Sequence, residues 1–99
     1  MALTTVSDAE ILAKVKSALG IGGDYQNDTL SIYISDVKDF MIAGGVSTNV
    51  VNSTLAVGAI CRGVSDIWNY GAGNTEFSLY FKQRVTQLAF MKVEESGGE

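Results

Sequence analysis

SDAEILAKVKSALG, residues 7–20, carries every signal of one complete helix. Ser7 is followed three residues later by Glu10, a spacing at which the two side chains bond reciprocally to the free backbone amides of a helix start. Gly20 is the residue type that ends helices in the left-handed conformation. Between these limits apolar residues recur at helical spacing: Ile11, Leu12, Val15, Ala18 and Leu19. The stretch predicts a helix over about residues 8–19.

The same pattern predicts a second helix over about residues 27–43. This run follows Asp24 or Asn27, either of which can cap a helix, and it ends at Gly44 and Gly45. Its apolar stripe consists of Leu30, Ile34, Val37 and Met41, widened by Ile32, Tyr33 and Phe40. At about 1.5 Å per residue such a helix is about 25 Å long. We expect it to span the whole body of the protein.

A third run predicts the central helix over about residues 48–70, starting near Ser47 and ending at Gly71. Two interleaved series in it repeat every seven positions, namely Val50, Val57, Val64 and Thr54, Cys61, Trp68. This spacing is typical of a coiled-coil seam, so we expect Trp68 to be buried. Residues 47–54 are rich in poor helix formers, which leaves open a frayed or extended lead-in.

Two glycines lie inside that run, and each costs a helix about 1 kcal/mol relative to alanine. Gly58 and Gly63 therefore predict the close approach of another backbone, and Ala59 with Gly63 would leave a shallow groove for a crossing helix. Arg62 and Asp66 lie four positions apart, a spacing that predicts a surface ion pair.

A fourth helix is predicted over about residues 75–92, after Asn74 or Thr75. Its apolar stripe consists of Phe77, Phe81, Val85, Leu88 and Met91. We expect the two ends of the chain, residues 1–6 and 93–99, to be flexible. The sequence thus predicts an all-α protein, built as a small bundle of four helices.

Composition limits the possible functions. Residues 1–99 suit one domain, and an apolar content of 46% is too high for a disordered chain. The formal charge of −4, with 7 scattered basic residues, argues against tight binding of nucleic acid. The single cysteine, Cys61, excludes an intramolecular disulfide and is interpreted as a small core residue. The N-terminus lacks the features of a signal peptide, and no apolar run is long enough to span a membrane.

Residues that would carry catalysis are few. Histidine is absent, which removes the usual base at neutral pH and the commonest metal ligand. Asp36 and Asp39 are interpreted as a solvated face, and Asp24 and Asp28 as capping residues near a helix start. Residues 20–23 are rich in glycine but lack the lysine of a phosphate loop. We predict no enzymatic activity, no cofactor and no metal site.

Two other classes of function remain open at this point. Four short helices are compatible with a helical DNA-binding regulator, for which the fourth predicted helix offers Lys82, Gln83, Arg84 and Gln87. A carboxylate-based hydrolase or metal enzyme would need several acids gathered in one pocket. Salt-dependent binding of duplex DNA would reveal the first class, and stabilisation by a metal would reveal the second.

Three stretches of the chain resemble the phage head-tail connector, or adaptor, proteins of long-tailed phages. They are VKSALGI at residues 15–21, AICRGVSDIWNYG at 59–71 and FKQRVTQL at 81–88. Acidic residues at Asp24 and Asp28 and the long helix over residues 30–43 also fit that family. The resemblance covers about residues 7–92.

The resemblance implies a structural subunit of a phage or prophage. Such a subunit forms a ring under the portal, extends the DNA channel and joins head to tail in the virion, after assembly in the host cytoplasm. It would be a homo-oligomer of about twelve copies that follows the symmetry of the portal, and it could be a monomer when isolated. Its partners would be the portal protein and a stopper or tail-completion protein. DNA would pass without sequence-specific binding, and no membrane would be involved.

Residues in the predicted loops and in the acidic tail are the candidate partner-docking residues of such a subunit. They are Gly22, Gly23, Asp24, Gly71, Gly73, Asn74, Glu94 and Glu95. We expect these segments to become ordered on contact with a partner.

Overall fold

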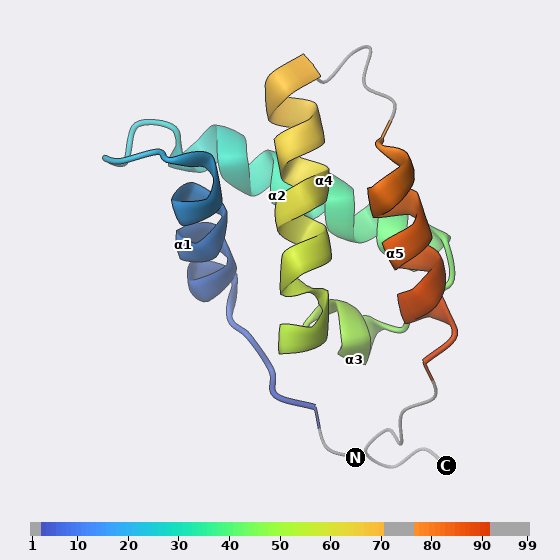
Figure 1. The fold of residues 1–99 in the computed structure, drawn as a ribbon. Helices are drawn as coiled ribbons and strands as arrows, with labels where there is room; N and C mark the ends of the chain where they lie inside the picture. The colour runs from blue at the N-terminus through green and yellow to red at the C-terminus, as the bar shows by residue number, and fades with distance from the viewer. Residues whose placement is uncertain (1–2, 71–76, 92–99) are drawn as a thin grey trace.

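The computed structural model describes residues 3–70 and 77–91, and within them the protein is built from helices (Figure 1). The elements are α1 (Asp8–Leu19), α2 (Asn27–Ala43), α3 (Thr48–Val51), the 3-10 helix η1 (Thr54–Ala56), α4 (Val57–Tyr70) and α5 (Leu79–Ala89). The predicted all-α class is confirmed. The third predicted helix, however, is divided into α3, η1 and α4.

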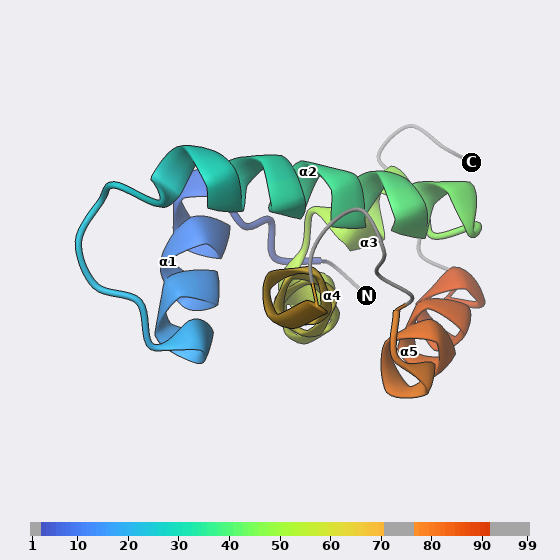
Figure 2. The ribbon, with the colours of Figure 1, turned by 90° about the horizontal axis from the view of Figure 1, so that it is seen from above.

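The helices form two layers. α2 makes up one layer and runs along the length of the molecule, as its predicted length indicated (Figure 2). α1, α4 and α5 lie side by side against one side of α2, with α4 in the middle. The buried faces of the helices meet in one hydrophobic core, and its largest fully buried side chains include Phe81, Ile11 and Leu30.

α1 begins and ends at the predicted residues. Ser7 Oγ accepts a hydrogen bond from the Glu10 backbone N–H at 3.1 Å, and Glu10 Oε1 accepts one from the Ser7 N–H at 2.9 Å. The bond from the Ser7 backbone, followed by that from its side chain, lowers the pKa of the Glu10 carboxyl. Gly20 has φ 71°, in the left-handed region, and its N–H bonds back to the last turn. Local chemistry therefore sets both ends of this helix.

α2 buries its predicted stripe, but its start is not capped as predicted. The buried residues are Leu30, Ile34, Val37 and Met41. Gln26 occupies the capping position and makes no side-chain bond there. The capping interpretation of Asp24 is wrong, because its side chain bonds to Lys16 and Asn27 instead. Asp28 lies in the first turn, where its carboxylate stabilises the positive end of the helix dipole.

The division of the third predicted helix begins at a serine. α3 starts after Ser47, as predicted, with Ser47 Oγ accepting from the Val50 N–H at 3.2 Å. Ser53 is extended and 1% exposed, and its Oγ accepts from the Leu55 N–H at 3.2 Å. A serine in this conformation caps a new helix start, so one continuous helix from residue 48 to residue 70 does not form.

An extended N-terminal segment pairs with this break. The Val6 N–H donates to the Asn52 carbonyl and the Thr54 N–H donates to the Thr4 carbonyl, both at 2.9 Å. Val6 is also buried in the core. The structure thus differs from the flexibility predicted for residues 1–6, since residues 3–6 are paired and packed. These bonds satisfy backbone groups that the interrupted helix leaves free.

The break changes which residues face the core. The buried face of α4 consists of Ala59, Ile60, Gly63, Val64 and Ile67. Trp68 and Cys61 are half-buried and Thr54 is exposed, so the seam predicted through these three residues is wrong. The seven-residue spacing counted Val50 and Val64 within one helix, whereas they lie in α3 and α4.

α5 begins at Leu79, later than the predicted start at residue 75. Its cap is Ser78, whose Oγ accepts from the Phe81 N–H at 3.2 Å. The Ser78 N–H donates in turn to the carboxylate of Asp66 on α4, at 3.0 Å. A local serine cap and a tertiary contact together fix this start, and the sequence pattern carries no sign of the tertiary contact.

Candidate docking surfaces

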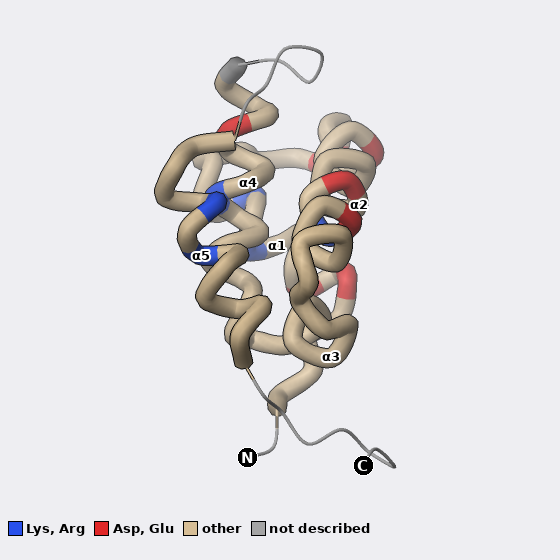
Figure 3. Tube along the Cα trace, turned by 90° about the vertical axis from the view of Figure 1, so that its right-hand side faces the viewer, with Lys and Arg blue, Asp and Glu red and all other residues tan. Residues whose placement is uncertain are grey.

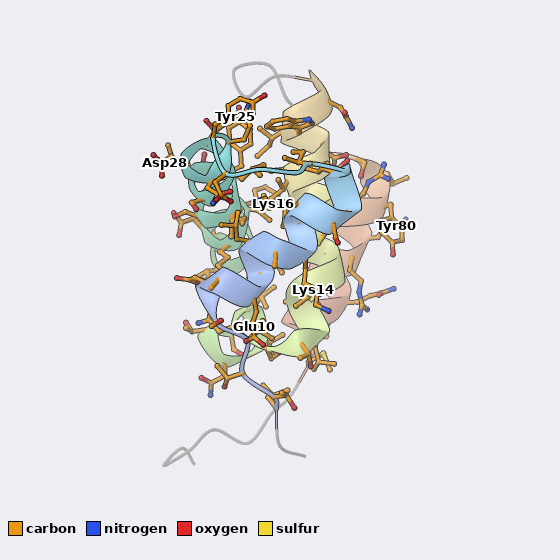
Figure 4. All side chains as sticks on the ribbon, turned by 90° about the vertical axis from the view of Figure 1, so that its left-hand side faces the viewer. Glu10, Lys14, Lys16, Tyr25, Asp28 and Tyr80 are labelled. Carbon is orange, nitrogen blue, oxygen red and sulfur yellow. The ribbon has the colours of Figure 1, made fainter. Side chains whose placement is uncertain are left out.

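The turn between α1 and α2 presents three of the predicted docking residues to solvent. Gly22, Gly23 and Asp24 are all exposed, and Gly23 has φ 74°. Asp24 Oδ1 lies 3.2 Å from Lys16 Nζ, a contact that ties the turn to α1. The adjacent Tyr25 is 87% exposed and stands at the edge of the molecule (Figure 4). The turn is an anchored, accessible loop with an aromatic side chain beside it.

The remaining predicted docking residues lie outside the described residues. They are Gly71, Gly73, Asn74, Glu94 and Glu95. The flexible tail predicted from residue 93 also falls there. Docking at these positions, and at the turn, stays a prediction.

A buried carboxylate joins α4 to the start of α5. Asp66 is 3% exposed; its Oδ2 accepts from the Ser78 N–H, and its Oδ1 lies 3.4 Å from Arg62 Nε. Arg62 Nε also lies 3.3 Å from Ser78 Oγ, and its guanidinium carbon lies 6.0 Å from the centroid of the Tyr80 ring. The sequence predicted this ion pair at the surface, but its acid is buried. Burial is tolerated because the carboxylate has both an ionic and a backbone partner.

Gly63 lies where α4 meets both α2 and α5. A Cβ at this position would lie 2.8 Å from Phe81 Cε1 and 2.9 Å from Val37 Cγ1, so a close approach is present, but side chains make it and not the backbone that was predicted. Gly58 differs, because no heavy atom of the described residues lies within 4 Å of the corresponding Cβ. The close approach predicted for Gly58 is not found within the described chain.

Gly58 forms part of the floor of an open groove of about 520 Å³. η1 and the start of α4 line one side of this groove, and α5 lines the other side. The residues that line the groove include Thr54, Leu55, Gly58, Tyr80, Gln83 and Arg84. The Arg84 guanidinium donates to Gln87 Oε1 at 3.0 Å. Among the described residues no carboxylate forms an ion pair with Arg84. The groove therefore carries a positive charge without an acidic partner in that part of the chain.

The outer side of α2 forms a second surface, the acidic face. Asp28, Asp36 and Asp39 are exposed on it, together with Ile32 (61% exposed) and Ile42 (44% exposed). Helical spacing places these five residues opposite the buried stripe of α2. Within residues 3–70 and 77–91 these three aspartates form no ion pair. The interpretation of Asp36 and Asp39 as a solvated face is confirmed.

The groove and the acidic face look in opposite directions. In Figure 3 the acidic residues gather along α2, whereas the basic residues lie mostly on α1, α4 and α5. In Figure 4 Asp28 points away from α2 at one edge of the molecule and Tyr80 points away from α5 at the other edge. An uneven charge distribution of this kind favours contact between unlike faces of two molecules.

The sequence analysis identified part of the acidic face, in Asp36 and Asp39, but gave it no binding role, and it missed the groove. Asp28, Ile32, Asp36 and Asp39 share one side of a helix by spacing alone, so the acidic face could have been found. The groove depends on the placement of η1 relative to α5, and Gly58, whose Cβ position meets no described atom, is its local sign.

The described residues offer little for catalysis. In that part of the chain no group of three or more cysteine or acidic residues is placed to hold a metal ion. Burial raises the pKa of the half-buried Cys61 thiol, and the nearby Lys14 offsets this only in part. The reactive thiolate is therefore disfavoured at neutral pH.

These properties define a small all-α protein, built from helices throughout the described residues. None of the helices in the described residues combines the length and the apolar character that a bilayer span requires. A family model described as phage gp6-like head-tail connector protein matches residues 10–99, and the chain belongs to this family of structural phage proteins. Comparisons with curated proteins and with solved structures found no match.

Proposed function

We propose that the protein is a structural subunit of a phage or prophage head-tail connector, and that it forms a ring under the portal, extends the DNA channel and joins head to tail. The family match over residues 10–99 carries this proposal. A chain of 99 residues buries a small core and gains stability by association. Closed rotational symmetry is the usual form of such homo-oligomers, and about twelve copies would follow the portal.

The ring would have partners on both sides. The portal protein would bind on the head side and a stopper or tail-completion protein on the tail side, in the virion after assembly in the host cytoplasm. The exposed turn at Gly22, Gly23 and Asp24 supports a docking role in one of these contacts. The acids Glu94 and Glu95 of the tail are proposed as a further docking element.

The proposal includes neither catalysis nor a cofactor. The membership of a structural family supports this. DNA would pass through the channel without tight binding, because a subunit with a formal charge of −4 repels a polyanion.

Electron microscopy of the protein mixed with the portal encoded near its gene tests the proposal. We expect a ring coaxial with the portal. Particles made without the gene should be tailless or should leak DNA. Normal tailed particles in the absence of the gene would contradict a connector role.

Titration with duplex DNA at low and moderate salt provides a second test. We expect only non-specific binding, with a Kd of about 10⁻⁴ to 10⁻⁶ M at physiological salt. Tight, sequence-selective binding would instead indicate a helical DNA-binding regulator that reads bases with α5.

A further inference from the structure

We propose that the acidic face of α2 in one copy of the protein docks in the groove between α4 and α5 of the next copy. This inference rests on the ring proposed above, and it names the two surfaces that would form the contact between neighbouring subunits. It assigns a role to Gly58, which no contact among the described residues explains, and to the aspartates of α2, which form no ion pair within those residues.

Gly58 supplies the steric part of the argument. A glycine weakens a helix, and at Gly63 the reason is the contact with Val37 and Phe81. At Gly58 the corresponding space is empty of described atoms and belongs to the groove floor. A floor without a side chain allows a helix from outside to approach closely, which is how amphipathic helices bind in grooves.

Charge supplies the second part. Arg84 lines the groove and has no acidic partner among the described residues, and the same holds for Asp36 and Asp39 on α2. These two aspartates lie one helical turn apart, so both carboxylates can reach one guanidinium. An arginine side chain is well suited to bind two carboxylate oxygens. The charge of the groove also disfavours partners that carry a positive charge.

Exposed apolar side chains supply the third part. Ile32 on the acidic face is 61% exposed, and Tyr80, which lines the groove, is also 61% exposed; Leu79, the next residue of α5, is 70% exposed. Specific protein contacts combine an apolar centre with a polar rim, and each of these surfaces carries both. Docking would bury apolar side chains of both surfaces, and this burial stabilises a contact more than exposed ion pairs do.

The positions of the two surfaces determine the kind of assembly. Because α2 forms one layer and α4 and α5 lie in the other (Figure 2), one copy can use its acidic face toward one neighbour and its groove toward the other. A contact between unlike faces repeats from copy to copy and forms a ring when its rotation closes. The turn between α1 and α2 takes no part in this contact and remains available for the portal.

Charge reversal tests the contact directly. Asp39→Arg or Arg84→Glu alone places like charges together, and we expect each to weaken association between copies about tenfold or more. The double variant Asp39→Arg/Arg84→Glu restores opposite charges and should return within about threefold of the unaltered protein. Sedimentation velocity measures self-association, electron microscopy scores rings on the portal, and circular dichroism verifies that each full-length variant is folded.

Two further variants separate the contact from the fold and from net charge. Gly58→Gln fills the groove floor with a good helix former and no charge, and we expect it to keep the fold and to lose association about tenfold or more. Lys14→Glu, on the exposed side of α1, makes the same charge change as Arg84→Glu outside both surfaces. It should leave association unchanged.

The possible outcomes distinguish this contact from the proposed function. Rings that form equally well with Asp39→Arg, Arg84→Glu and Gly58→Gln would overturn the contact and leave the connector role intact. Rings that are lost with Arg84→Glu and on removal of residues 93–99, but tolerate Asp39→Arg, would place the acidic tail in the groove and also overturn the contact. An unaltered protein that forms neither rings nor oligomers would overturn both proposals.

Discussion

Gly63 and Gly58 lie in the same helix, α4, but the space next to each is opposite in character. At Gly63 a methyl group would meet Phe81 at 2.8 Å and Val37 at 2.9 Å, whereas at Gly58 it would meet no described atom within 4 Å. The comparison shows that a glycine inside a helix does not always mark a close contact within the chain. Gly63 is explained by contacts within the chain, whereas the described residues provide no contact that explains Gly58.

The largest effect should come from the side chain that fills the space beside Gly63. Phe81 is fully buried and lies 4.6 Å from the Phe77 ring and 5.7 Å from the Phe40 ring, measured between centroids. Phe81→Ala should lower the free energy of unfolding by about 3 to 5 kcal/mol. Urea denaturation followed by circular dichroism measures this. A loss below about 1 kcal/mol would show that the region around Gly63 is loosely packed.

Gly63→Ala tests the same region from the opposite direction. The added methyl group overlaps Phe81 and Val37, so we expect a loss of about 1 to 3 kcal/mol despite the better helix propensity of alanine. The double variant Gly63→Ala/Phe81→Leu serves as the control. The double variant should lose less stability than the sum of the losses in Gly63→Ala and in Phe81→Leu, because leucine leaves room for the methyl group. Strict additivity would mean that the two residues do not contact each other.

Trp68 gives a third point on α4, near its C-terminal end. Its half-buried ring packs edge-on against Tyr33, with centroids 6.4 Å apart and an interplanar angle of 71°. Trp68→Ala should cost about 1 to 2 kcal/mol, less than truncation of a fully buried aromatic residue. The same denaturation experiment measures it, with Phe81→Ala as the reference. A cost equal to that of Phe81→Ala would restore Trp68 to the core, where the seven-residue pattern placed it.

Gly58→Ala should have the smallest effect and the opposite sign. The methyl group enters open space near the start of α4, and alanine is the better helix former, so we expect a gain of about 0.5 kcal/mol. Thermal denaturation of Gly58→Ala beside Gly63→Ala measures the difference between the two sites. A loss greater than about 1 kcal/mol at Gly58 would remove the contrast between the two glycines.

The parts of the fold that the sequence predicted depend on neighbouring residues in the chain. Ser7, Glu10 and Gly20 set the ends of α1 through bonds that span a few residues, and the stripe of α2 follows from spacing alone. The parts that it did not predict depend on distant partners. The break at Ser53 also pairs with the N-terminal segment, and the Ser78 N–H at the start of α5 also bonds a carboxylate on α4.

The same distinction applies to the candidate site. Spacing showed that Arg62 and Asp66 form a pair, but only the packing of α5 shows that Asp66 is buried. The acidic face was present in the spacing of α2, while the groove required the relative placement of η1 and α5. Residues in loops, such as Gly22 and Gly23, carry no periodic pattern and no internal contact that would assign them a partner.

The pairing of the N-terminal segment with the break after α3 has a consequence for local unfolding. Asn52 and Thr54, on the two sides of the break, both form backbone hydrogen bonds with the N-terminal segment. The Val6 N–H donates to the Asn52 carbonyl, and the Thr54 N–H donates to the Thr4 carbonyl. Lys38 Nζ adds a further tie, because it bonds Asn52 Oδ1 at 3.1 Å. Detachment of the first residues therefore exposes the amides of Val6 and Thr54 together, in one cooperative opening. In hydrogen exchange these two amides should share one protection factor, although α1, α2 and α3 separate them along the chain.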